Sequence, residues 1–230
     1  MRGVSDEEQP PPAVRAQLLA TEHWSLLASR STTQGEVLTR ISMFLTLVSA
    51  GLVSLALIGQ ATAFRGSFFA FSIGVLAFVC LVGLLTEIRV LNVGMEDAMY
   101  VLAMNRLRGA YADLDPELAG YLMASPHDDR AGMERTYYFL GRRSDFGQVG
   151  GSSMVFIIAL NTALLGLLGA AIAGAAGAAV PLVVAIGIAV GLLAFGVSMV
   201  AGGRRFFRLW QYYRPVSPTP PGGERPPGVA

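Results

Sequence analysis

The segment Ile41–Gly59 reads ISMFLTLVSAGLVSLALIG, and it decides the class of the fold. It lies within 24 consecutive uncharged residues, between Arg40 and Arg65. A helix needs about 20 apolar residues to cross the hydrocarbon core of a bilayer. The segment therefore has the length and composition of a membrane span.

Two further uncharged blocks extend this interpretation to the whole chain. The 21 residues between Arg65 and Glu87 hold one more span, and the 58 residues between Asp145 and Arg204 are long enough for two. Composition agrees, since 14% of residues are charged against about a quarter in soluble proteins. We expect an all-α integral membrane protein with four spans in two hairpins. The remaining spans are expected at about Ser67–Thr86, Ser152–Ile172 and Leu182–Gly202, with turns at Ala61–Gly66 and Ala173–Pro181.

Arginine placement predicts the orientation of these spans. Sixteen of the seventeen arginines lie outside the hairpin loops, and only Arg65 lies in one. Because short cytoplasmic segments collect positive charge, we expect a multi-pass protein of the cell membrane with both termini cytoplasmic. The predicted organisation is an N-terminal cytoplasmic segment with an amphipathic helix (1–40), a first transmembrane hairpin (41–87), a cytoplasmic helical segment (88–150), a second transmembrane hairpin (151–203) and a basic-aromatic segment with a disordered Pro-rich tail (204–230).

The longer cytoplasmic helices can be predicted from apolar spacing. A helix is expected over Ala13–Arg30, with Trp24 on an apolar face that packs on another helix or lies at the bilayer interface. Ser31–Gly35 is expected to interrupt it before the first span. Beyond Glu87 the apolar stripe continues, so the second span is expected to be one long helix.

Shorter helices complete a small cytoplasmic lobe. Asp115 followed by proline and glutamate predicts a helix start, with an end near Ala124. A further helix is expected over Asp129–Arg143, capped by Asp128 or Asp129. From Pro215 onward, six prolines and three glycines predict disorder.

Two polar residues near or within the spans are candidates for a pore lining. Glu87 lies at the end of the second span beside Arg89, where a solvated interfacial position or a channel mouth would suit it. Asn161 is the one strongly polar residue deep in a span. Hydrogen bonding between helices or lining of a pore would explain it.

Small residues are abundant in the third and fourth spans. Gly187 and Gly191 form a GxxxG pair, which lets helix backbones approach closely. The pair predicts either a tight second hairpin within one chain or an interface between copies.

A basic-aromatic stretch follows the fourth span. Arg204, Arg205, Arg208 and Trp210 are candidates for contact with the bilayer interface, where arginines meet anionic lipid headgroups and rings anchor a helix. Either general anchoring or a lipid-specific site would produce this composition.

No catalytic constellation is visible in the sequence. The chain has two histidines, His23 and His127, one cysteine, Cys80, and no GxSxG, P-loop or HExxH motif. We therefore expect no enzyme activity, cofactor, metal site or nucleic-acid partner. The expected function is that of a self-associating membrane subunit or scaffold, with a homo-oligomeric channel or pore-type effector as the alternative.

Two resemblances concern the first part of the chain. EHWSLLASR (22–30), RISMFLT (40–46) and SAGLV (49–53) resemble a group of bacterial multi-pass membrane proteins without an assigned activity, over about the first ninety residues. The amphipathic lead-in, two-span hairpin and long helix are also similar to the SLATT type of two-helix membrane effector, a pore-forming partner of nucleotide-sensing systems. The second hairpin departs from that pattern, and no functional residue carries over.

Overall fold

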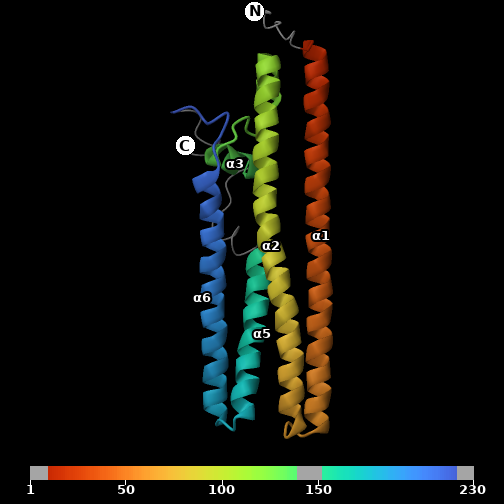
Figure 1. The fold of residues 1–230 in the computed structure, drawn as a ribbon, viewed down its shortest axis with the longest axis vertical. Helices are drawn as coiled ribbons and strands as arrows, with labels where there is room; N and C mark the ends of the chain where they lie inside the picture. The colour runs from red at the N-terminus through yellow and green to blue at the C-terminus, as the bar shows by residue number, and fades with distance from the viewer. Residues whose placement is uncertain (1–9, 139–151, 222–230) are drawn as a thin grey trace, which may run out of the picture. The chain divides into compact units, whose positions relative to one another are not determined.

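The computed structural model describes residues 10–138 and 152–221, and every regular element in these ranges is a helix. This confirms the all-α prediction. Four of the helices, α1, α2, α5 and α6, are long and apolar enough to cross a membrane. In chain order the elements are α1 (Pro12–Ala61), α2 (Ser67–Leu114), the 3-10 helix η1 (Pro116–Tyr121), α3 (Arg130–Tyr137), α5 (Ser153–Ala175) and α6 (Val180–Tyr212) (Figure 1).

The chain divides into two compact units, which are described separately. Unit 1 comprises residues 1–32, 96–142 and 213–230, and unit 2 comprises residues 33–95 and 143–212. Helices α1 and α2 each contribute residues to both units, whereas α5 and α6 belong to unit 2.

Helix α1 is continuous over 50 residues, so the predicted interruption at Ser31–Gly35 is wrong. The hydroxyl of Thr32 donates to the carbonyl of Ala28 at 3.0 Å, which satisfies that polar side chain inside the helix. The residues on either side of this segment are held by other contacts, since Arg30 binds Asp97 and Val37 is buried. These contacts stabilise the helix although the helix propensity of the segment is low. Tertiary contacts of this kind override helix propensity.

Helix α2 is also continuous, over 48 residues, which confirms that the helix expected to form the second span continues well beyond Glu87. After it, Asp115 accepts a hydrogen bond from the Glu117 amide at 3.0 Å and caps η1. This helix is a 3-10 helix and ends at Tyr121, whereas the predicted helix ended near Ala124.

Helix α3 starts where the sequence indicates. The carboxylate of Asp129 accepts a hydrogen bond from the Gly132 amide at 2.7 Å, so Asp129 and not Asp128 is the cap. The predicted continuation to Arg143 reaches beyond Tyr138 into residues outside the described ranges.

The core of unit 2 is apolar and is shared by α1, α2 and α5. Phe44 of α1 and Ile157 of α5 are among its most completely buried side chains. The core consists of Val37, Ile41, Phe44, Val48, Leu76, Val79, Cys80, Val90, Val93, Ile157 and Leu164.

Helix α6 packs on α5 through glycines. A Cβ atom built on Gly166 would lie 2.7 Å from the carbonyl oxygen of Gly187, closer than real side chains approach a backbone oxygen. The two helices are joined by a turn in which Gly177 has φ +77°, a conformation that favours glycine.

The surface of unit 2 is unusually apolar. No residue is buried in the most apolar stretch of α6, where Leu192 and Leu193 are 69% and 70% exposed. Apolar patches of this extent are rare on soluble monomers and mark surfaces for lipid or other proteins. The large exposed apolar residues of α6 are Val180, Leu182, Val184, Ile188, Leu192, Leu193, Val197, Val200 and Phe207.

Candidate functional site

The polar centre of unit 2 is a buried pair formed by Glu87 of α2 and Asn161 of α5. The side-chain amide nitrogen of Asn161 donates to a carboxylate oxygen of Glu87 at 2.8 Å. Glu87 is 4% exposed and Asn161 is 1% exposed. Glu87 is therefore not at the solvated position that was the simplest expectation from the sequence. The structure joins the two candidate residues, which lie 74 positions apart in the chain.

Gly83 makes the room that this pair occupies. It lies one helical turn before Glu87 on the same face of α2. A Cβ atom at this position would collide with the side-chain oxygen of Asn161 and would lie 2.8 Å from the ring of Phe44. Position 83 therefore requires glycine, because Asn161 and Phe44 approach its backbone closely. The spacing of Gly83 four residues before Glu87 is the one feature of the sequence that indicates the contact between Glu87 and Asn161.

One atom of the pair is not hydrogen bonded. The side-chain oxygen of Asn161 is buried, and no donor in the described part of the chain reaches it. The neighbouring buried hydroxyls do not help, because Thr86 donates to the Val82 carbonyl and Thr162 to the Ala159 carbonyl within their own helices. Since buried polar groups without partners are costly, this oxygen is the least satisfied group of the pair.

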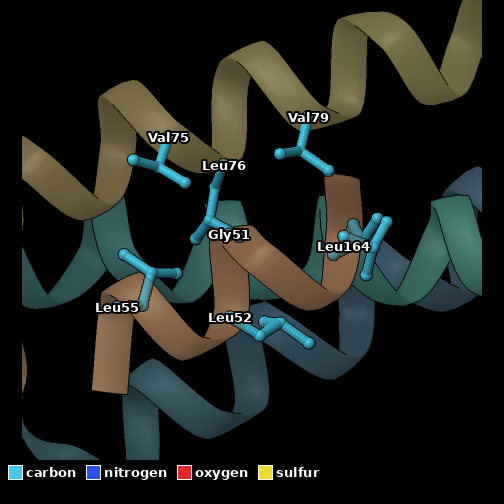
Figure 2. Close-up of a pocket in the computed structure, with 8 residues that line it drawn as sticks. Gly51, Leu52, Leu55, Val75, Leu76, Val79 and Leu164 are labelled. Carbon is cyan, nitrogen blue, oxygen red and sulfur yellow. The ribbon is translucent and has the colours of Figure 1, made fainter. Parts of the chain in front are cut away.

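The gap between α1, α2 and α5 is a packing defect rather than a ligand site. It is lined by aliphatic side chains around Gly51 and has no space for a water molecule (Figure 2). Its lining residues are Val48, Gly51, Leu52, Leu55, Val75, Leu76, Val79 and Leu164.

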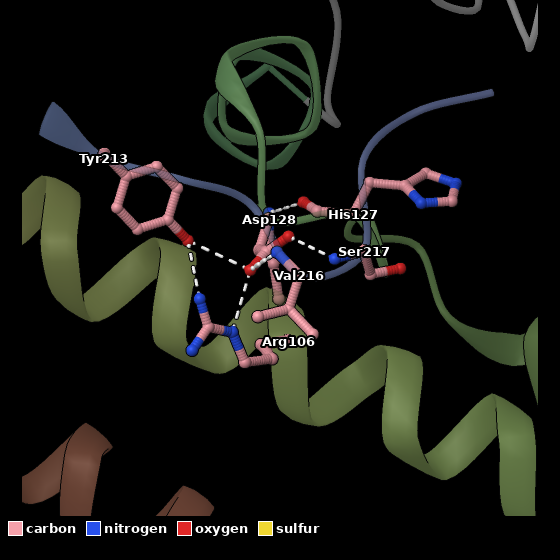
Figure 3. A network of polar contacts seen from close by, with 7 residues as sticks. Arg106, His127, Asp128, Tyr213, Val216 and Ser217 are labelled. Carbon is pink, nitrogen blue, oxygen red and sulfur yellow. Dashed lines mark hydrogen bonds and ion pairs between the residues drawn. The ribbon is translucent and has the colours of Figure 1, made fainter. Parts of the chain in front are cut away.

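Unit 1 has a different polar centre, the fully buried carboxylate of Asp128 (Figure 3). Arg106 of α2 donates its Nε to this carboxylate at 2.8 Å, and the hydroxyl of Tyr213 donates at 3.0 Å. The backbone amides of Val216 and Ser217 donate at 3.0 Å and 2.7 Å. Burial alone would raise the pKa of Asp128, but these donors together lower it below the ordinary value.

These contacts hold residues 213–219, which we call the C-terminal strap. The Asp128 amide donates to the Ser217 carbonyl at 3.1 Å, so the strap is bound by the backbone as well as by the carboxylate. Asp129 accepts from both the amide and the hydroxyl of Thr219, each at 2.8 Å. The expectation of disorder from Pro215 onward thus differs from the structure for Val216–Thr219, while residues 222–230 lie outside the described ranges.

A second ion-paired group in unit 1 joins α1, α2 and α3. Arg30 donates two hydrogen bonds to the carboxylate of Asp97, at 2.6 Å and 3.1 Å, and Tyr137 donates a third at 2.5 Å. Burial, and then the hydrogen bond to the Asp97 carboxylate, raise the pKa of Tyr137. The tyrosine therefore remains a donor in this contact.

The histidines have structural surroundings. His23 stacks on Tyr111 with ring centroids 6.0 Å apart, and burial lowers its pKa. Within residues 10–138 and 152–221, no three His, Cys, Asp or Glu side chains lie close enough to hold a metal ion. Trp24 is 71% exposed, so most of its side chain is not covered by any helix that the structure describes.

The remaining predicted residues lie on α6. A Cβ atom on Gly187 would lie 3.1 Å from the Gly166 carbonyl oxygen, and one on Gly191 would lie 3.3 Å from the Thr162 carbonyl oxygen. Both glycines therefore contact α5 of the same chain. The basic-aromatic residues Arg204, Arg205 and Arg208 are exposed, whereas Trp210 is half-buried and packs edge-on against Phe206.

No protein-family model, curated protein or solved structure matches the chain. The resemblances noted in the sequence therefore stay predictions.

Proposed function

We propose that this chain is a non-enzymatic multi-pass protein of the cell membrane that acts as a self-associating subunit or scaffold. In this proposal α1, α2, α5 and α6 each cross the bilayer, and the unbroken helices α1 and α2 carry unit 1 on the cytoplasmic side. The outward apolar surface of α6 supports membrane insertion, because its exposed leucines and valines would be unfavourable in water.

The proposed topology has two hairpins with both termini in the cytoplasm. Its support is the distribution of arginines, since Arg65 is the one arginine in either inter-span turn. Because Cys80 is the single cysteine, it can be replaced by serine and new cysteines can be labelled with an impermeant maleimide on intact cells. Ala179→Cys, in the exposed turn before α6, should react, and Tyr121→Cys, exposed in unit 1, should not. The reverse pattern would overturn the topology.

The main support for a self-associating scaffold, as opposed to a pore, is the burial of Glu87 and Asn161 against each other. A pore between copies needs polar groups on surfaces that face a shared channel. These two side chains instead contact each other within one chain, and the surface left for partners in the bilayer is apolar. Close packing between apolar helices is the usual means of association in lipid.

Two measurements on the purified protein test this reading. The mass of the protein in nanodiscs should correspond to two or more copies, and liposomes that contain it should not conduct ions. A monomer would overturn self-association. Ion conductance that rises with the number of copies would overturn the scaffold.

The unbonded oxygen of Asn161 favours one alternative, a pore-type effector. A carboxyl group and a polar group with spare hydrogen-bonding capacity inside apolar helices are typical of ion pathways. If this alternative holds, Glu87→Gln and Asn161→Leu should change the conductance or its selectivity. A conductance that both variants leave unchanged would rule out a pathway through this pair.

A further inference from the structure

The end of α6 carries three arginines that form no ion pair with the residues that the structure describes. Arg204, Arg205 and Arg208 are all exposed, and in the described part of the chain no carboxylate forms an ion pair with any of them. Arg204 and Arg208 are one helical turn apart and lie on the same side of α6, with Arg205 next to them. Three fixed positive charges thus lie together on one helix surface.

The glutamates of unit 2 that the structure describes are already engaged by other groups. Glu36 binds Arg89 at 3.2 Å and Arg40 at 3.6 Å, and Glu87 is buried against Asn161. Neither carboxylate neutralises the arginines of α6. The described part of the chain therefore leaves their charge available to an external anion.

The arginines lie at the depth of lipid headgroups in the proposed membrane placement. From Val180 to Arg204 the helix rises about 36 Å, slightly more than the roughly 30 Å of the hydrocarbon core. Phe207 and Tyr212 are exposed among and after them, and aromatic rings of this kind gather at membrane interfaces.

Helix α6 is packed against α2 close to these arginines. Helix α6 is continuous to Tyr212, and Gly202 is buried where α6 meets α2, with a built Cβ atom 3.1 Å from the Leu91 side chain. The arginines are therefore presented from a packed helix, which reduces the entropy lost when they bind a ligand.

We propose that Arg204, Arg205 and Arg208 form a binding surface for the phosphate groups of anionic lipids, and that it selects them over zwitterionic lipids. Guanidinium groups match phosphate oxygens with paired hydrogen bonds. A lipid fits better than a free phosphate ion, because the surface borders the apolar stretch of α6 that would hold acyl chains. This inference rests on the proposed membrane placement of α6.

Tryptophan quenching can measure the lipid composition beside these arginines. The chain has two tryptophans, so Trp24→Phe leaves Trp210 as the single tryptophan, within two helical turns of all three arginines. The full chain would be placed in phosphatidylcholine vesicles with a minor fraction of either brominated phosphatidylglycerol or brominated phosphatidylcholine. We expect the brominated anionic lipid to quench more, with a local enrichment of about fivefold or above, as headgroup attraction of ~1 kcal/mol per arginine implies. Added salt should reduce this excess.

Matched variants test whether these three side chains cause the excess quenching by the brominated anionic lipid. Arg204→Gln, Arg205→Gln and Arg208→Gln together should remove it, while Arg15→Gln, Arg65→Gln and Arg130→Gln, which remove the same charge elsewhere, should not. Inorganic phosphate at constant ionic strength should leave it unchanged if lipid is the ligand, and loss of the excess would assign the surface to free phosphate instead.

The outcomes separate this inference from the membrane proposal. Equal quenching by both brominated lipids, or an excess that survives the triple substitution, would overturn the lipid surface and leave membrane insertion intact. Absence of quenching by either lipid would overturn the membrane placement of α6 itself.

Discussion

Replacement of Gly166 by alanine is expected to force α5 and α6 apart. The new Cβ atom would lie 2.7 Å from the Gly187 carbonyl oxygen, which is 0.7 Å short of the 3.4 Å where ordinary contact begins. The opposing atom belongs to the backbone of a helix, so it cannot rotate away as a side chain could. Overpacking of this kind typically costs about 1–3 kcal/mol.

The matched control is Gly196→Ala, on α6. A Cβ atom there meets nothing within 4 Å, so the substitution adds no packing strain. Both substitutions gain the same helix propensity, up to about 1 kcal/mol in water, and this gain cancels when the two variants are compared. Gly166→Ala should therefore be less stable than Gly196→Ala by the full overpacking cost of about 1–3 kcal/mol.

Unfolding in mixed micelles, followed by circular dichroism as the fraction of denaturing detergent rises, would measure this difference. The wild-type chain and both variants would be compared at the same protein concentration. Equal unfolding free energies for Gly166→Ala and Gly196→Ala would refute the close glycine contact between α5 and α6.

Three further expectations concern the buried polar groups. Asn161→Leu should lower the free energy of unfolding by at least about 1–3 kcal/mol, because it leaves the Glu87 carboxyl group buried without its donor, and an unchanged value in the micelle assay would contradict the pair. Glu87→Gln should cost less, since the glutamine oxygen still accepts from Asn161, and a larger loss than for Asn161→Leu would show that the charge itself matters. Asp128→Ala should release the strap, which hydrogen exchange would record as faster exchange of the Val216 and Ser217 amides, whereas unchanged exchange would mean that other contacts hold the strap. The pKa of Asp128 is lowered from its ordinary value of 3.8, so its stabilisation of the strap is complete above pH 3.8 and is lost as the pH falls through the lower pKa of the folded protein. Protection of the strap amides, corrected for intrinsic exchange, should therefore stay constant from neutral pH toward 3.8 and decrease only below it.

Local sequence signals predicted the helices well because helix ends and apolar spans depend on near neighbours. Asp115 and Asp129 cap the helices that follow them, as their spacing indicates. The segment Ser31–Gly35 misled the prediction, because its weak helix propensity is outweighed by the Arg30–Asp97 ion pair and by burial of Val37. Those contacts involve other helices and cannot be read from the segment itself.

The candidate sites were harder to predict because their partners are distant in the chain. Glu87 and Asn161 were each identified, but their contact depends on how α2 and α5 are rotated about their axes. Asp128 was predicted as one of two possible helix caps. Its role in binding the strap depends on residues 85 to 89 positions later, for which the sequence contains no periodic signal.

The unbroken course of α1 also limits insertions and deletions within unit 2. Val37, Ile41, Phe44 and Val48 follow one another at spacings of four, three and four residues, and all four belong to the apolar core. Successive helical residues are about 100° apart around the axis. Deletion of a single residue between Ile41 and Phe44 would therefore turn the two residues before it away from the two after it by that angle, and α1 has no loop there to absorb the change.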